Sequence, residues 1–143
     1  MKKILFVCKH NIFRSRVAEM FFNKLNHNKN YHASSAGLIR WKKRDLKGVE
    51  GFLAEKKVAK KHGLNLKVRS KSINSSILKK TDILIIVAND VPASIFKKER
   101  SFNGKLIVWS IKDVKQKDKN KELVAEKTIN FIENKVKNLV DNL

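Results

Sequence analysis

Segments of strand length alternate with segments of helical periodicity along the whole chain of 143 residues. Strands are expected at residues 3–8, 31–36, 82–88 and 105–109. Apolar residues at helical spacing predict helices at 15–25, 49–62 and 73–80 and a last one from Ala125 onward. Another helix is expected to open at Asp90, with this aspartate as its N-cap. Strands that alternate with helices favour right-handed crossovers and a parallel sheet covered on both faces. The expected fold class is therefore α/β: one three-layer domain over residues 1–143, with a four-stranded parallel sheet flanked by helices.

Composition argues against several other classes of protein. Hydrophobic residues make up 42% of the chain and include eight Phe and two Trp, which suffices for a core and disfavours disorder. The longest uncharged apolar stretch, residues 83–89, is far shorter than the roughly 20 residues of a membrane helix. The N-terminal apolar run is too short for a secretory signal, and one cysteine cannot form an internal disulfide. We expect a cytoplasmic protein with no membrane partner.

The chain carries a formal net charge of +20, from 33 Lys and Arg against 13 Asp and Glu. Such an excess is typical of proteins that bind nucleic acids, because lysine and arginine displace counterions from phosphates. The basic residues are spread over the sequence, however, and do not form one stripe with aromatic residues between them. We therefore expect at most nonspecific attraction to nucleic acid. The excess equally fits a chain rich in Lys, Asn and Ile throughout.

The loop after the first expected strand has a pattern that points to anion chemistry. Cys8 ends the strand, five residues follow, and Arg14 and Ser15 open the next helix. A loop that turns tightly into a helix directs successive backbone N–H groups at one point, where the helix dipole adds positive charge. A thiol at that point is favoured as the thiolate, which is the nucleophilic form. Arg14 suits a bidentate grip on a tetrahedral anion, Ser15 can donate to the sulfur, and Asn11 tolerates left-handed backbone.

In its motifs the chain resembles the low-molecular-weight protein tyrosine phosphatases, a family that shares its fold with one class of arsenate reductase. The resemblance runs through most of the chain. The matching residues are Ile4 to Cys8, Asn11-Ile12, Arg14-Ser15 and Ala18-Glu19 at the opening, Ser34 to Gly37 in the second strand, Lys60 to Leu64 at a helix end, and Thr81 to Leu84 at the start of the central strand. The opening motif is specific and the later matches support it. By this resemblance, the loop after the first strand is the phosphatase P-loop.

The resemblance implies a phosphomonoester hydrolase, in the first place a protein tyrosine phosphatase, with a cysteinyl-phosphate intermediate on Cys8. Arg14 would hold the transferring group, and Asp113 in a late loop would be the general acid, with Asp118 as the alternative. Trp41 lies in the loop that by resemblance walls the pocket, where its indole would stack on a phosphotyrosine ring or anchor the loop. The substrate-binding set is completed by the P-loop residues Lys9, His10, Asn11, Ile12, Phe13, Arg14 and Ser15.

The implied chemistry needs no metal and no cofactor. His27, His32 and His62 lack the spacing of metal ligands, so no metal site is expected. The expected partners are a phosphotyrosine protein or a small phosphomonoester, with phosphate or an arsenate-like oxyanion as the group bound in the loop.

Several positions depart from the family's usual pattern. A glycine is usual where His10 stands, and this histidine would either contact substrate or point to solvent. A second cysteine that can protect the nucleophile is common where Phe13 stands. The other departures are Arg16 and Val114 in place of proline, Val68 in place of histidine, and Ala88 in place of aspartate. Two alternatives stay open: an arsenate reductase that uses an external thiol, because the chain has no second cysteine, and a catalytically weak basic protein that binds anions or nucleic acid.

Overall fold

The computed structural model describes residues 1–39, 50–67, 69–115 and 118–143. Trp41, which by resemblance walls the pocket, and Val68 lie outside the described residues. The strands are β1 (Lys2–Cys8), β2 (Tyr31–Gly37), β3 (Ile83–Val87) and β4 (Lys105–Trp109). The helices are α1 (Arg14–Leu25), α2 (Glu50–Lys61), α3 (Ser75–Lys79), the short π-helix η2 (Ile95–Glu99) and α4 (Lys121–Asp141). Among the described helices, none is both long and apolar enough to span a membrane.

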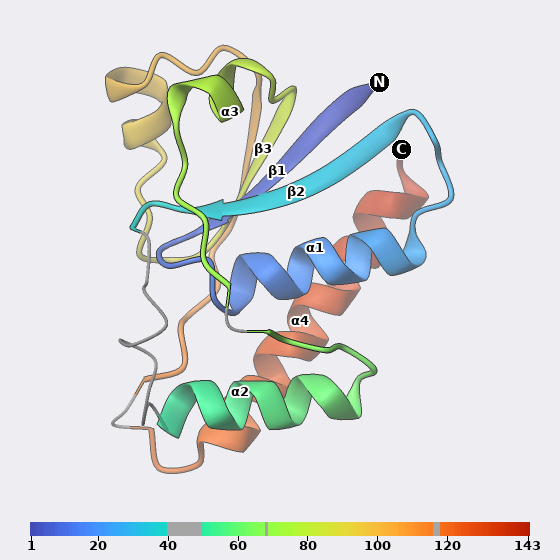
Figure 1. Cartoon of the computed structure of the whole chain (residues 1–143), viewed down its shortest axis with the longest axis vertical. Helices are drawn as coiled ribbons and strands as arrows, with labels where there is room; N and C mark the ends of the chain where they lie inside the picture. Colours follow the sequence, from blue (N-terminus) through green and yellow to red (C-terminus); the bar gives the residue numbers. More distant parts are fainter. Residues whose placement is uncertain (40–49, 68, 116–117) are drawn as a thin grey trace.

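The four strands form one parallel sheet in the order β2-β1-β3-β4 (Figure 1), which confirms the predicted sheet. β1 lies between β2 and β3, and Cys8 at its end is opposite Gly37 at the end of β2. The chain passes from β1 toward one edge of the sheet and from β3 toward the other. The connections therefore diverge at the carboxyl ends of β1 and β3, and parallel sheets bind their ligands at such a point.

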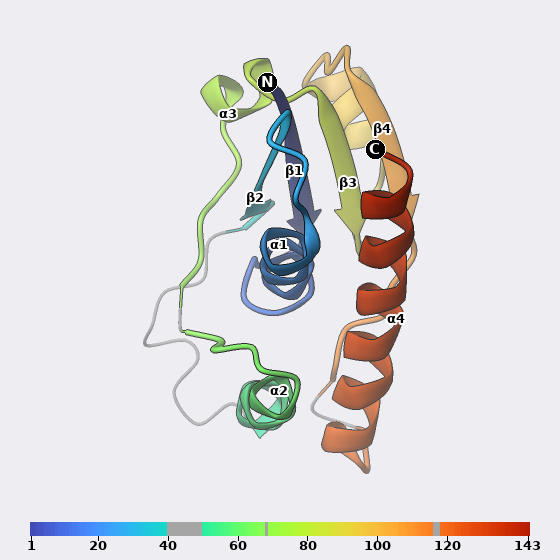
Figure 2. The same ribbon diagram turned by 90° about the vertical axis from the view of Figure 1, so that its right-hand side faces the viewer.

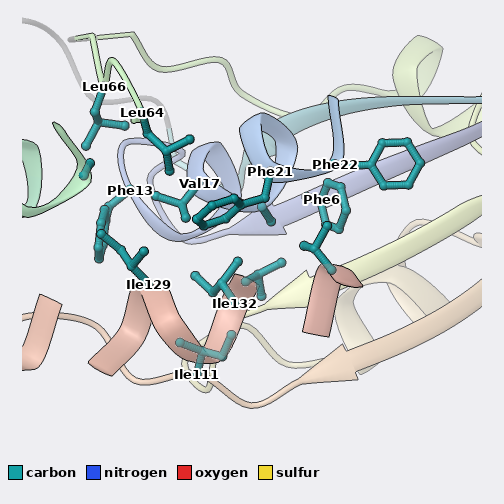
Figure 3. Packing of buried hydrophobic residues seen from close by; sticks show 14 of the residues in the cluster. Phe6, Phe13, Val17, Phe21, Phe22, Leu64, Leu66, Ile111, Ile129 and Ile132 are labelled. Atoms are coloured by element: carbon teal, nitrogen blue, oxygen red, sulfur yellow. The ribbon is translucent and has the colours of Figure 1, made fainter. Parts of the chain in front are cut away.

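Helices cover both faces of the sheet and bury its central strands on both sides. α1 and α4 lie over one face, and α3 and η2 lie over the other (Figures 1 and 2). Side chains of β1 alternate between these layers: Ile4 and Phe6 join the core beneath α1 and α4, whereas Leu5 and Val7 join the opposite one. Figure 3 shows the first of these cores, with side chains from α1, α4 and β1 in contact: Phe6, Val17, Phe21, Phe22, Ile129 and Ile132. The three-layer arrangement is the one expected.

The helix expected to open at Asp90 is placed differently. η2 begins only at Ile95, with Ser94 at its N-cap position and no side-chain cap. The carboxylate of Asp90 contacts the guanidinium of Arg14 instead. The carboxylate of Asp90 is therefore engaged with a buried cation of α1 and does not cap a helix.

Candidate active site

The P-loop joins β1 to α1, and one of its residues has a left-handed backbone conformation. Asn11 has φ of 58°, as its residue type allowed, and its backbone N–H points back at the thiol, 3.3 Å from Sγ of Cys8. Gly37 of β2 lies directly behind the loop. A Cβ atom at Gly37 would come within 2.8 Å of the carbonyl carbon of His10 and 2.9 Å of the nitrogen of Asn11. The loop therefore needs glycine as its neighbour in β2.

At the start of α1, a row of backbone N–H groups has no acceptor among the residues that the structure describes. Phe13 occupies the N-cap position, and its apolar side chain provides no cap; it packs into the core instead (Figure 3). Val17 donates to the carbonyl of Phe13, and in the described part of the chain no N–H between residues 12 and 16 donates to another group. These N–H groups lie at the positive end of the α1 dipole. This is the backbone arrangement that the predicted anion cradle requires.

Cys8 is 2% exposed and forms two polar contacts through its sulfur. Besides the N–H of Asn11, Oγ of Ser15 lies 3.0 Å from Sγ. The side chain of Asn11 braces this arrangement, since its Nδ2 donates to Oγ of Ser15 at 2.8 Å and to Oγ of Ser35 at 2.9 Å. All these polar side chains are buried, so each bond is shielded from water. The sulfur therefore lies at one end of a buried polar network.

Arg14 is 2% exposed and is oriented by the loops that follow β3 and β4. Its Nη1 donates to the carbonyl of Ile111 at 2.9 Å, and its Nη2 donates to Oδ2 of Asp90 at 3.3 Å; Nη1 also lies 3.1 Å from Oδ1 of Asp90. Burial disfavours the charged guanidinium, but the nearby Cys8, Asp113 and Asp90 outweigh it and raise the pKa of Arg14. Among the described residues, these hydrogen bonds leave the hydrogen of Nε and the second hydrogen of Nη2 without an acceptor at hydrogen-bond distance. That edge is the fork with which arginine grips two oxygens of a tetrahedral anion.

Asp113 lies beside this free edge, whereas Asp118 does not. Oδ1 of Asp113 is 3.8 Å from Nε of Arg14, and its carboxyl group is about one-third exposed. Oδ2 of Asp118 instead accepts the backbone N–H of Lys115 at 2.8 Å. The structure thus brings Asp113 to the P-loop and gives Asp118 a local contact.

His10 is a partly buried member of the P-loop and does not project fully into solvent. Burial lowers the pKa of its imidazole, Lys9 and Arg14 lower it further, and Asp113 and Asp90 act in the opposite direction. The carbonyl of His10 accepts a hydrogen bond from the hydroxyl of Ser70 at 2.6 Å. The imidazole thus lies within the electrostatic reach of both carboxylates.

Sequence reasoning missed four polar residues near the site. Asp90 follows β3, and only the strand order reveals that β3 ends next to β1. Ser35 and Glu19 stood in matched motifs without an assigned role, and they bond to each other at 2.6 Å. Glu55 of α2 is 4% exposed; burial, with the charge of Asp113, raises its pKa well above the ordinary range, and Arg14 opposes this. No pattern in the sequence singles out Glu55.

Comparison with known proteins assigns the family. The sequence model described as "Low molecular weight phosphotyrosine protein phosphatase" matches residues 3–143. The chain belongs to this phosphatase family. The family is one of metal-independent hydrolases, and membership supports phosphatase activity. No curated protein sequence matches the chain significantly.

Solved structures with the same fold include both phosphatases and a reductase. Arsenate reductase from Archaeoglobus fulgidus is 25% identical, with a TM-score of 0.67 over 96% of this chain and 98% of that one. Wzb from Vibrio vulnificus, solved with benzylphosphonate, is 20% identical, with a TM-score of 0.76 over 99% of each chain. The low molecular weight protein tyrosine phosphatase SP-PTP from Streptococcus pyogenes is 19% identical, with a TM-score of 0.74 over 100% of this chain and 93% of that one. The last two likenesses concern the fold alone.

Proposed function

We propose that this chain hydrolyses phosphomonoesters, with phosphotyrosine in proteins as the main substrate class, through a cysteinyl-phosphate intermediate on Cys8. One observation carries the proposal. The sulfur of Cys8 lies at the base of a loop whose N–H groups have no acceptor among the described residues, and the edge of Arg14 formed by Nε and Nη2 borders the same loop. A phosphate dianion seated there would have its phosphorus in front of the sulfur and its oxygens on N–H donors.

In the first step the thiolate of Cys8 attacks phosphorus. An S–P bond forms, the bond from phosphorus to the ester oxygen breaks, and Asp113 gives its proton to the leaving oxygen. Arg14 and the P-loop N–H groups stabilise the charge on the other three oxygens, which is the main contribution expected in phosphoryl transfer.

In the second step water removes the phosphoryl group. Asp113, now a carboxylate, takes a proton from the water as its oxygen bonds to phosphorus and the S–P bond breaks. Ser15 donates to the departing sulfur, which stabilises it as the leaving group. Phosphate is released, and Cys8 and Asp113 return to their starting protonation states.

The remaining P-loop residues bind substrate mainly through their backbone. The side chain of Phe13 is in the core, so its N–H group faces the ligand in its place. Lys9, His10 and Ile12 line the mouth of the P-loop with partly exposed side chains.

Trp41 is proposed as the wall against which an aromatic ring of the substrate stacks. Excess lysine outside the loop steers acidic or phosphorylated substrates toward it, and contact with nucleic acid is nonspecific.

The test is hydrolysis of an aryl phosphate by the wild type and by Cys8→Ser. Activity should survive a chelator and disappear in the variant; activity that persists in Cys8→Ser would refute the proposal.

The role of Asp113 is tested by Asp113→Asn, with Asp118→Asn as the matched control. Asp113→Asn should slow esters of poor leaving groups far more than those of good ones, because only poor leaving groups need the proton. Equal slowing of both classes, or the same pattern in Asp118→Asn, would exclude Asp113 as the acid.

A second candidate function is arsenate reduction with an external thiol. It is favoured by the 25% identity to the Archaeoglobus fulgidus protein whose title names that activity. Reducing arsenate to arsenite takes two electrons, which two thiols supply by forming a disulfide; here these would be Cys8 and a thiol from another molecule, since the sequence has one cysteine. Arsenate-dependent oxidation of glutathione or thioredoxin, lost in Cys8→Ser, would support this function. Its absence, with aryl phosphate turned over, would leave the phosphatase alone.

A further inference from the structure

Arg16, in the first turn of α1, is a buried cation just beyond the P-loop. Its side chain is 9% exposed, Nη1 donates to Oε1 of Glu19 at 3.1 Å, and Nε has no hydrogen-bond partner among the described residues. Burial lowers the pKa of Arg16, Arg69 lowers it further by like-charge repulsion, and Glu19 opposes both. Burying a guanidinium with one nitrogen unsatisfied is unfavourable. The ion pair with Glu19 is the contact that offsets this cost.

Glu19 ends a chain of hydrogen bonds that begins at the proposed nucleophile. Oε1 of Glu19 accepts from Oγ of Ser35 at 2.6 Å. Nδ2 of Asn11 donates to Ser35 at 2.9 Å and to Ser15 at 2.8 Å, and Oγ of Ser15 lies 3.0 Å from Sγ of Cys8. Asn11 thus stands at the centre of two arms, with one serine in each arm.

The direction of each bond follows from what its members can donate and accept. A carboxylate only accepts, so Ser35 gives its hydroxyl hydrogen to Glu19 and accepts from Asn11. The backbone N–H of Lys71 donates to Oδ1 of Asn11 at 3.0 Å, which orients the amide with both Nδ2 hydrogens toward the serines. Ser15 accepts one of these, so its own hydroxyl hydrogen is left to donate to the sulfur. The arrangement works only while Glu19 is an acceptor.

We propose that Arg16 is a positioning residue for the nucleophile: through its ion pair it holds Oε1 of Glu19 against Ser35 and so keeps Ser15 donating to Cys8. Without Arg16, the carboxylate of Glu19 would lose its ion-pair partner and would be free to turn away from Ser35. Ser35 would then lack its acceptor, and its hydroxyl hydrogen would compete with the amide hydrogens of Asn11. Asn11 would lose that anchor, and Ser15 would lose its fixed donor. The inference rests on the proposed role of Cys8.

The primary test is the pH profile of Cys8 alkylation by iodoacetamide, which reports the thiolate without turnover. In Arg16→Met we expect its midpoint to rise by about one pH unit and kcat/KM for an aryl phosphate to fall about tenfold. Arg14, the cation that faces the sulfur directly, is unchanged in these variants. A shifted alkylation profile in a protein with no phosphatase activity would refute the proposed function and still support this inference.

The Glu19→Gln background separates positioning from a general effect on the fold. Glutamine keeps an acceptor at Oε1 but forms no ion pair with Arg16, so Arg16→Met should change alkylation less than about twofold there. Arg16→Lys should restore most of the wild-type profile. The matched control is Arg100→Met, which removes the same charge from an exposed site before β4, at the opposite end of the sheet, and should change nothing.

Two results would overturn the inference: an unshifted alkylation profile in folded Arg16→Met, or an equal shift with and without Glu19→Gln. Circular dichroism and a melting curve establish that each variant is folded. Where Arg16→Met does not fold, Arg16→Gln replaces it in the same comparison, because glutamine keeps a donor and lacks the charge.

Discussion

Gly37→Ala tests how closely β2 supports the P-loop. The added Cβ would lie 2.8 Å from the carbonyl carbon of His10, 2.9 Å from the nitrogen of Asn11 and 3.0 Å from the carbonyl oxygen of Lys9. Ordinary contacts begin at 3.4 Å, so the loop would have to retreat by about half an ångström. All three atoms are backbone, and no side-chain rotation can relieve the overlap. Hydrogen bonds to Lys71 and Ile73 hold Gly37 itself in place, so the movement falls on the loop.

The expected magnitude follows from this geometry. Overpacking a tight site costs about 1–3 kcal/mol, and we expect a loss of unfolding free energy in that range. A catalytic group misplaced by about 1 Å loses about 10²-fold in rate, so a shift of half that size should lower kcat/KM by roughly 10-fold or more. Affinity for inorganic phosphate should fall in parallel, because the N–H groups of the loop move together.

Urea unfolding and aryl phosphate kinetics measure both effects, and Gly51→Ala is the matched control. A Cβ at Gly51 would lie 3.7 Å from the carbonyl oxygen of Val114, an ordinary contact, within the first turn of α2. That variant should be neutral or stabilised by up to about 1 kcal/mol through helix propensity. If Gly37→Ala keeps wild-type stability and kcat/KM, the close support of the loop by β2 is refuted.

Three further predictions concern charge. Asp90→Asn should lower the unfolding free energy by about 1–3 kcal/mol and reduce kcat/KM, because buried Arg14 loses its charged partner; unchanged urea unfolding would show that the ion pair does not stabilise the fold. Burial and Asp113 raise the pKa of Glu55, so the native state holds this proton more tightly than the unfolded chain and stability falls as pH rises above about 4.3. Glu55→Gln removes that fall, and its stability advantage over the wild type should grow with pH up to the native pKa of Glu55; parallel stability curves would contradict the raised pKa. The net charge of +20 should make kcat/KM for an acidic phosphopeptide fall roughly tenfold or more as salt rises from low to physiological concentration, and less for a small aryl phosphate; equal salt dependence would exclude steering.

The alternation of strands and helices and the P-loop could be predicted from the sequence, because both depend on local patterns. Buried strands are apolar runs, and the segment from Cys8 to Ser15 is contiguous, so its chemistry is visible before the chain folds. The left-handed conformation expected at Asn11 also depends only on the residue type, and the structure confirms it. The packing of Trp109 against Phe6, with ring centroids 5.8 Å apart, also follows from a strand end buried under α4.

The partners of the P-loop could not be predicted, because they are distant in sequence and meet only through the sheet order. Asp90 was expected to cap a helix, and its approach to Arg14 depends on β3 lying next to β1. Arg16 and Glu19 are three residues apart on a helix, so their ion pair is local. The hydrogen bond that Ser35 donates to Glu19 is not local, and it is the bond that links the pair to the nucleophile.

The most direct measurement is to trap the covalent intermediate by mixing the enzyme with an aryl phosphate, quenching in acid within milliseconds, and locating the phosphoryl group by peptide mass spectrometry. The proposed mechanism predicts a phosphoryl adduct on the peptide that contains Cys8, more abundant in Asp113→Asn because its hydrolysis needs a base. Turnover without any adduct on Cys8, or an adduct on another residue, would contradict it.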